Sequence, residues 1–223
     1  MSPHRWVPVA LDLAGRRVVC IGAGPVAAGK LTALDGAGAR VEVIAPQVSD
    51  EVVEVAADLR ATLTRRTYRA GDLDGAAFVL AATATPSVNE SVAVAAAAAG
   101  VPCVRADARA GSTTPGDAAL LATIVRGRLT VAVGTSGAAP ALTVALRAEA
   151  AERYDPAYAD LVELAAELRT DPRVRAALAG LSGAQRRRRW RALLDGATLR
   201  HIRLGDLATA REEAISCLCS STD

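Results

Sequence analysis

A short β-branched run that leads into a glycine-rich turn is the feature that most constrains this chain. Arg-Val-Val-Cys-Ile occupies positions 17–21, and Gly-Ala-Gly-Pro-Val-Ala follows at 22–27. A strand, a Gly-x-Gly-x-x-Ala turn and a helix, in that order, are typical of dinucleotide-binding proteins. Gly22 permits a tight turn, Gly24 lets a pyrophosphate approach the backbone, and Ala27 keeps the helix close to the strand. Such motifs are common, so the rest of the chain decides its meaning.

Strand and helix patterns alternate through the first half of the chain. Strands are predicted at 17–21, 40–45, 61–68, 76–82 and 102–106, and helices at 25–37, 49–57 and 89–99. This alternation predicts an α/β fold with a Rossmann-type parallel sheet. Because ligands bind beyond the carboxyl ends of parallel strands, we expect Gly22, Pro46, Thr83 and Asp107 along one edge of the sheet.

The second half predicts a small α+β module followed by helices. Two strands at 118–125 and 129–133, joined around Arg126-Gly127-Arg128, form a hairpin signal. Helices are then predicted at 141–153, 158–168, 173–178 and 184–194, with a last segment near 204–218. We therefore expect three domains: a Rossmann domain at 1–112, the small module at 113–153 and a helical C-terminal domain at 154–223.

Composition argues against several functional classes. The net charge of +2 gives no general attraction to nucleic acid or anionic membranes. No apolar run reaches the ~18 residues of a membrane-spanning helix, and the first residues lack a secretory signal pattern, so a soluble cytoplasmic protein is expected. Four cysteines without metal or disulfide spacing, and two isolated histidines (His4 and His201), predict no protein metal site.

The strongest charge run is Gln-Arg-Arg-Arg-Arg-Trp-Arg at 185–191. It could contact nucleic acid, with Trp190 stacking on bases. It could instead be a solvated basic helix face with Trp190 turned inward, or a face that guides an anionic substrate. Since the remaining chain shows no nucleic-acid-binding pattern, the solvated face is favoured and no nucleic-acid partner is expected.

The acidic residue that normally follows the second strand of a Rossmann domain is missing. That strand ends Ile44-Ala45-Pro46-Gln47, and Glu42 lies in its middle. In this chain, backbone groups around Pro46 and Gln47 would have to hold the ribose hydroxyls.

Several segments together resemble one family. They are Val-Cys-Ile-Gly-Ala-Gly-Pro-Val-Ala-Ala-Gly-Lys at 19–30, Gly-Ala-Arg-Val-Glu-Val-Ile-Ala-Pro at 38–46, Ala-Ala-Thr-Ala-Thr-Pro-Ser-Val-Asn at 81–89, Val-Arg-Ala-Asp at 104–107 and Thr-Val-Ala-Val-Gly-Thr-Ser-Gly-Ala-Ala-Pro-Ala-Leu at 130–142. In order and spacing they resemble the precorrin-2 dehydrogenase family, the N-terminal module of siroheme synthase, whose members in some cases also act as sirohydrochlorin ferrochelatases. The resemblance covers about residues 5–150.

The resemblance implies NAD as cofactor, precorrin-2 as substrate and a homodimer built on the middle module. It implies that Asp107 is the catalytic carboxylate, which accepts a proton while NAD takes a hydride, and that Thr135 lies near the tetrapyrrole. It further implies these NAD contacts: Gly22, Ala23, Gly24, Pro25, Val26, Pro46, Gln47 and Thr83.

A tetrapyrrole with many carboxylates needs cationic surroundings. Arginines that flank the expected site in sequence could pair with those carboxylates; they are Arg105, Arg109, Arg126, Arg128 and Arg147. The chain departs from the family pattern at Val104, Ala122, Gly134 and Ala139, which leaves tetrapyrrole contacts and any metal insertion open.

Two other functions remain as alternatives. One is a non-catalytic, NAD-sensing Rossmann regulatory module whose basic helical tail contacts a partner. The other is a chelatase that has lost its dehydrogenase activity.

Overall fold

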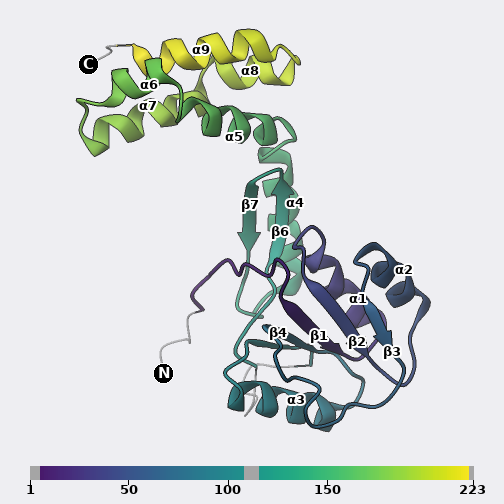
Figure 1. Cartoon of the computed structure of the whole chain (residues 1–223). Helices are drawn as coiled ribbons and strands as arrows, with labels where there is room; N and C mark the ends of the chain where they lie inside the picture. Colours follow the sequence, from purple (N-terminus) through teal and green to yellow (C-terminus); the bar gives the residue numbers. More distant parts are fainter. Residues whose placement is uncertain (1–5, 108–115, 221–223) are drawn as a thin grey trace. The chain divides into compact units, whose positions relative to one another are not determined.

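The computed structural model describes residues 6–107 and 116–220. The chain forms two compact units, each with its own core (Figure 1). The first unit combines the described residues of Met1–Leu121 with Gly134–Pro140, and the second combines those of Ala122–Val133 with Ala141–Asp223. The division into three domains at 112/113 and 153/154 stays a prediction.

A five-stranded parallel sheet is the centre of the first unit, as predicted for a Rossmann-type fold. The strands lie in the order β3-β2-β1-β4-β5, and every neighbouring pair is parallel. The strand order reverses between β1 and β4, which is where such folds bind their ligands. The strands are β1 (Arg17–Ile21), β2 (Arg40–Ile44), β3 (Thr62–Thr64), β4 (Phe78–Ala81) and β5 (Cys103–Arg105).

Helices cover both faces of this sheet. They are α1 (Pro25–Leu31), continued by the 3-10 helix η1 (Thr32–Leu34), α2 (Asp50–Asp58) and α3 (Pro86–Ala98). Because successive side chains of a strand point to opposite faces, Val18 and Cys20 pack in the core beneath α1 and α2. Val19 and Ile21 pack in the core beneath α3. The two central strands are therefore apolar and buried on both faces, at residues 18–21 of β1 and along all of β4, as expected for a sheet covered on both sides.

The second unit contains an antiparallel hairpin and a helical region, also as predicted. The hairpin joins β6 (Ala122–Arg126) to β7 (Leu129–Val133). Three of its described helices have an N-cap residue whose side chain accepts a backbone hydrogen bond. These residues are Asp171 for α6, Ser182 for α7 and Asp206 for α9. The helices are α4 (Pro140–Arg153), α5 (Ala157–Leu168), α6 (Pro172–Leu178), α7 (Gly183–Asp195), α8 (Ala197–Arg203) and α9 (Leu207–Cys219).

Several observed elements differ from the predicted ones. Strand β6 begins at Ala122 rather than 118, because Ala118 N donates to Cys103 O (3.2 Å) and this segment lies along β5 instead. Pairing of Arg126 with Leu129 leaves a two-residue turn. Helix α8 is present where no helix was predicted, and β3 is shorter than predicted.

No helix within the described ranges is both long enough and apolar enough to cross a membrane.

Candidate functional site

The turn at Gly22 brings the end of β1 against the end of β4. Gly22 has φ +108°, a conformation that L side chains rarely adopt. A Cβ atom at this position would lie 2.3 Å from Ala82 O and 2.8 Å from Thr83 N. Its N–H donates to Ile44 O at 2.9 Å, which ties the turn to β2 as well. Glycine is therefore required here for close backbone packing at the point where the strand order reverses.

Gly24 differs from Gly22, because it faces open space. It is the N-cap of α1, no side chain caps the helix, and Pro25 follows at the first helical position. A Cβ atom on Gly24 would meet nothing within 4 Å. The side chain of Val26, in the first turn, is 60% exposed. An open, uncapped helix start that carries a glycine fits the pyrophosphate of a dinucleotide, which accepts hydrogen bonds from backbone N–H groups.

The loop after β2 is connected to the glycine turn. Ser49 N donates to Ala23 O at 2.9 Å, and Ala23 is buried. Pro46 and Gln47 are exposed at the carboxyl edge of the sheet. The parallel register therefore places Pro46 and Gln47 at the same edge as Gly22, as the sequence predicts.

Glu42 is engaged elsewhere. Its carboxylate forms an ion pair with Arg17 at 2.7 Å and accepts a hydrogen bond from Thr64 Oγ1 at 3.4 Å. Glu42 therefore cannot supply the ribose-binding acid that the end of β2 lacks.

Asn89 holds the Thr83 loop, a role that sequence reasoning did not assign. Its Oδ1 accepts from Thr83 N (2.9 Å) and Thr83 Oγ1 (2.8 Å), and its Nδ2 donates to Thr83 O (3.0 Å). Asn89 is fully buried, so these bonds form away from water. The Asn at the end of the 81–89 motif was the available signal, but its position in an Ala-rich helix gave no indication of its partners.

Asp107 lies just past β5 and forms a two-point ion pair with Arg105. Arg105 Nε donates to Asp107 Oδ1 at 2.8 Å and Nη2 donates to Oδ2 at 3.3 Å. This guanidinium lowers the pKa of Asp107 below its usual value, and the nearby Asn89 amide lowers it further. Asp107 is thus ionised at neutral pH, while its side chain keeps 27% exposure. Asn89 therefore holds the Thr83 loop and also lies close enough to influence the Asp107 carboxylate.

The other predicted substrate contacts fall in different parts of the chain. In the first unit, Thr135 accepts a hydrogen bond from Ala139 N at 3.2 Å and orders the loop before α4. In the second unit, Arg126 donates to Tyr154 O (3.1 Å) and Arg128 pairs with Glu163 (3.0 Å). Arg109 lies outside the described residues.

The structure gives a partner within the protein to each of the four predicted substrate contacts that it describes. Arg105 already pairs with Asp107, and its side chain is only 9% exposed, so it acts on that carboxylate directly. The proposed contacts of Thr135, Arg126 and Arg128 with the substrate stay predictions.

Among residues 6–107 and 116–220, no group of three or more His, Cys, Asp and Glu side chains gathers in a way that could hold a metal ion. The expectation that the protein has no metal site of its own also stays a prediction.

Comparison with known proteins agrees with this geometry. Residues 9–114 match a family model described as "Putative NAD(P)-binding". The chain is 34% identical to siroheme synthase of Pseudomonas paraeruginosa over 205 residues, which is 92% of this chain and 42% of that protein. It is 35% identical to siroheme synthase of Gluconacetobacter diazotrophicus over 216 residues, 93% of this chain and 43% of that protein.

A solved structure resembles nearly the whole chain. The structure of "SirC, precorrin-2 dehydrogenase" matches with a TM-score of 0.61 and 26% sequence identity, over 94% of this chain and 98% of that one. The chain spans less than half the length of the curated siroheme synthases that it matches.

The fold and the glycine turn define a Rossmann-type NAD(P)-binding protein. The parallel sheet, hairpin and helical region then recur together in a protein of similar length. The chain belongs to the family of precorrin-2 dehydrogenase modules that form the N-terminal part of siroheme synthases.

Gly22→Ala and Gly24→Ala should separate folding from cofactor binding. Gly22→Ala places Cβ against the Ala82 carbonyl, so thermal unfolding should show a loss of about 2 kcal/mol or more. Gly24→Ala has room for Cβ and should change stability by less than about 0.5 kcal/mol. The added methyl would nevertheless obstruct a pyrophosphate and raise the Kd for NAD about tenfold or more. Equal effects of the two changes on stability would contradict this account.

Asn89→Ala should weaken both the fold and cofactor binding. It leaves the backbone groups of Thr83 without partners, at a cost of about 2 kcal/mol in the free energy of unfolding. Calorimetric titration should also show weaker NAD binding, because the Thr83 loop is no longer fixed. Ser91→Ala, an exposed change on the same helix, is the control. The assigned role of Asn89 would be wrong if both variants behaved alike.

Proposed function

We propose that this protein oxidises precorrin-2 to sirohydrochlorin with NAD as the electron acceptor, a step of siroheme synthesis. The observation that carries the proposal is an ionised, partly exposed carboxylate, Asp107, on the same sheet edge as an open glycine turn. When bound, NAD supplies the acceptor for a hydride. Two hydrogens leave the macrocycle in this oxidation, so one further group has to accept a proton.

Asp107 is the group that takes this proton. Its hydrogen bonds keep it deprotonated before the reaction, and a positioned base of this kind contributes about 10²- to 10⁴-fold to a rate. Arg105 orients the carboxylate through two bonds, and the Asn89 amide, which holds the Thr83 loop, helps to lower its pKa. A sensor without redox chemistry has no use for such a carboxylate, which is why an enzyme is the better proposal.

The glycine turn and the loop after β2 hold the cofactor. Backbone groups at Gly22, Ala23 and Gly24 face its pyrophosphate, and Val26 contacts it from the start of α1. Pro46 and Gln47 hold the ribose hydroxyls in place of an acid, while Thr83 borders the nicotinamide side. We propose NAD rather than NADP, because α2 begins with the exposed acids Asp50 and Glu51, which oppose an added phosphate beside Gln47.

The substrate carries several carboxylates, so cationic groups should orient it. We propose Arg126 and Arg128, together with Arg109, as partners of those carboxylates, and Thr135 as a hydroxyl contact. Guanidinium groups bind carboxylates through two parallel hydrogen bonds, which fixes orientation as well as affinity.

Substitution of Asp107 tests the reaction most simply. Purified wild-type protein with precorrin-2 and NAD should produce the absorbance of NADH, and NADP should be the poorer acceptor. Asp107→Asn should lower kcat about 10²- to 10⁴-fold and leave the Kd for NAD nearly unchanged. Asp35→Asn, an exposed control in the same unit, should retain full activity. Undiminished turnover by Asp107→Asn would remove this residue from the mechanism.

The pH dependence of the rate should report on Arg105. Because Arg105 lowers the pKa of Asp107, the base is ionised down to acidic pH, and activity is lost only when pH falls through that lowered pKa. Arg105→Gln removes the main cause, so the acidic limb of kcat should move to higher pH. Arg105→Lys keeps the charge but not the two-point geometry and should give a smaller displacement. An unmoved acidic limb in Arg105→Gln would contradict the assigned pairing.

We also propose that the protein is a homodimer whose interface includes α4. All of α4 is described, and none of its residues is buried within the single chain. Leu142 is 53% and Val144 is 67% exposed, and their spacing puts them on different sides of the helix. In the first unit, the segment before β1 also exposes Val7 and Val9. Apolar surface of this kind is typical of protein interfaces.

Light scattering coupled to size exclusion should show twice the mass of one chain. Leu142→Asp combined with Leu146→Asp should give monomers, because both side chains lie on the same face of α4 and are exposed in the single chain. Val53→Asp, another exposed apolar position, lies on α2 and should leave the mass unchanged. A monomeric wild-type protein would contradict the proposed dimer.

A further inference from the structure

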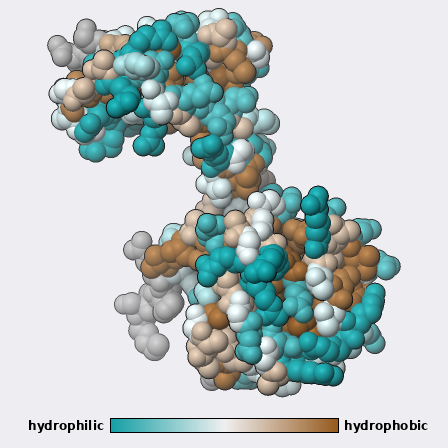
Figure 2. Space-filling view, viewed as in Figure 1, coloured by the Kyte–Doolittle hydropathy of each residue, from teal (hydrophilic) through white to brown (hydrophobic). Residues whose placement is uncertain are grey.

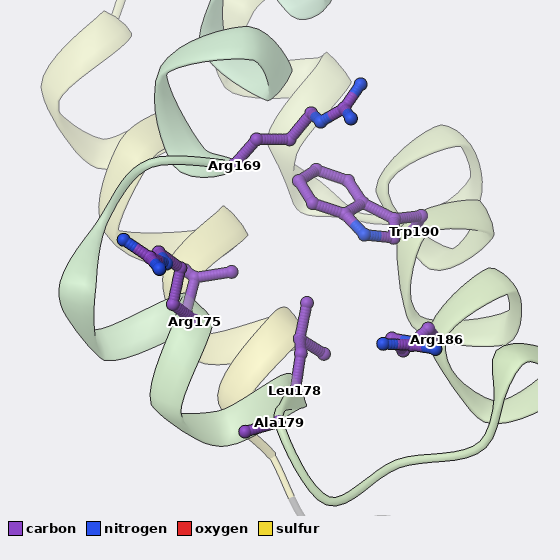
Figure 3. Close-up of a pocket in the computed structure, with 7 residues that line it drawn as sticks. Arg169, Arg175, Leu178, Ala179, Arg186 and Trp190 are labelled. Carbon is purple, nitrogen blue, oxygen red and sulfur yellow. The ribbon is translucent and has the colours of Figure 1, made fainter.

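A small cleft in the helical unit carries positive charge that the protein does not neutralise. It has a volume of about 310 Å³ and lies between α6, α7 and the C-terminal end of α5. Arg169, Arg175 and Arg186 line it together with Trp190 (Figure 3). Acidic residues are absent from the described lining.

The three cleft arginines differ from others in the same unit. Within the described chain, none of their guanidinium groups forms an ion pair or a side-chain hydrogen bond. By contrast, Arg203 pairs with Asp155 and Arg211 with Glu167. Three like charges around one cleft repel one another, and a bound anion would relieve that repulsion.

The remainder of the lining is apolar and includes a flat surface. Val174 and Leu178 are buried and belong to the core of the helical unit. Trp190 is half-buried and packs against that core. Its indole borders the cleft, and the side chain of Arg169 extends alongside it (Figure 3). Figure 2 shows the surface of the helical unit as mostly hydrophilic, with smaller hydrophobic areas. The cleft itself places an aromatic surface next to cations.

We propose that this cleft binds one edge of a planar, conjugated polycarboxylate. The arginines would pair with carboxylates, and Trp190 would stack on the ring. The volume is at the lower end of the range for small-molecule pockets, ~300–1,000 Å³, so the cleft holds an acid-bearing edge rather than a whole macrocycle. We choose carboxylates rather than phosphates as the anionic groups of the ligand, because the proposed function involves a tetrapyrrole. The cleft proposal rests on the proposed function for this choice only.

The test uses uroporphyrin as a stable planar polycarboxylate and the full chain in a Trp6→Phe background. Trp190 is then the only tryptophan, and its fluorescence should be quenched in a saturable way. Arg169→Gln combined with Arg186→Gln should weaken binding about tenfold. The matched control combines Arg188→Gln with Arg191→Gln, at two exposed α7 positions outside the cleft lining. This control should weaken uroporphyrin binding less than about twofold.

Three results would overturn the proposal. The first is that uroporphyrin does not quench Trp190 fluorescence in a saturable way. The second is that the two double variants weaken uroporphyrin binding equally. The third is that inorganic pyrophosphate binds as tightly as uroporphyrin and depends in the same way on Arg169 and Arg186. Precorrin-2 oxidation measured on the same proteins separates this proposal from the proposed function. A wild-type protein that fails to oxidise precorrin-2 but binds uroporphyrin in the cleft would contradict only the dehydrogenase. Oxidation without binding in the cleft would contradict only the cleft.

Discussion

The candidate site depends on the close approach of two backbone segments at Gly22. With no side chain at this position, the end of β1 packs directly on Ala82 and Thr83 at the end of β4. This contact fixes where the glycine turn lies relative to the Thr83 loop. Asn89 then fixes the Thr83 loop through three hydrogen bonds, and the same buried amide contributes to the lowered pKa of Asp107. The Thr83 loop and the Asp107 carboxylate are therefore both positioned close to Asn89.

Charge at this site keeps the Asp107 carboxylate ionised, as its proposed role as a base requires. Arg105 is largely buried and pairs with Asp107 through two bonds. A buried guanidinium needs such a partner, and the carboxylate gains a lower pKa in return. The lower pKa makes Asp107 a weaker base but ensures that it is ionised at neutral pH. That carboxylate remains partly exposed, as the proposed contact with a substrate requires.

The parallel sheet and the glycine turn were predictable because local patterns encode them. Apolar runs mark β1, β2 and β4, and Gly22 and Gly24 stand at fixed offsets from β1. The role of Asn89 was not predictable, because its partners are distant backbone and side-chain groups. The sequence predicted Arg105 as a substrate ligand. Its pairing with Asp107 was not predictable, because the pairing depends on the local course of the chain after β5.

Boundaries failed where tertiary contacts override local preference. The apolar residues 118–121 predicted part of a hairpin strand, but Ala118 bonds to Cys103 on β5 instead. Gly196 interrupts the pattern before α8, and that helix is held by burial of Leu199 and Ile202 in the helical core. Sequence alone gives no account of such packing.

We propose that the glycine turn and Asp107 serve one bound cofactor. A crystal structure of the protein with NAD would test this proposal. We expect the pyrophosphate against the backbone of Gly22 to Gly24 and the nicotinamide ring beside the Asp107 carboxylate. A pyrophosphate bound elsewhere, or a nicotinamide ring that lies away from Asp107, would contradict it.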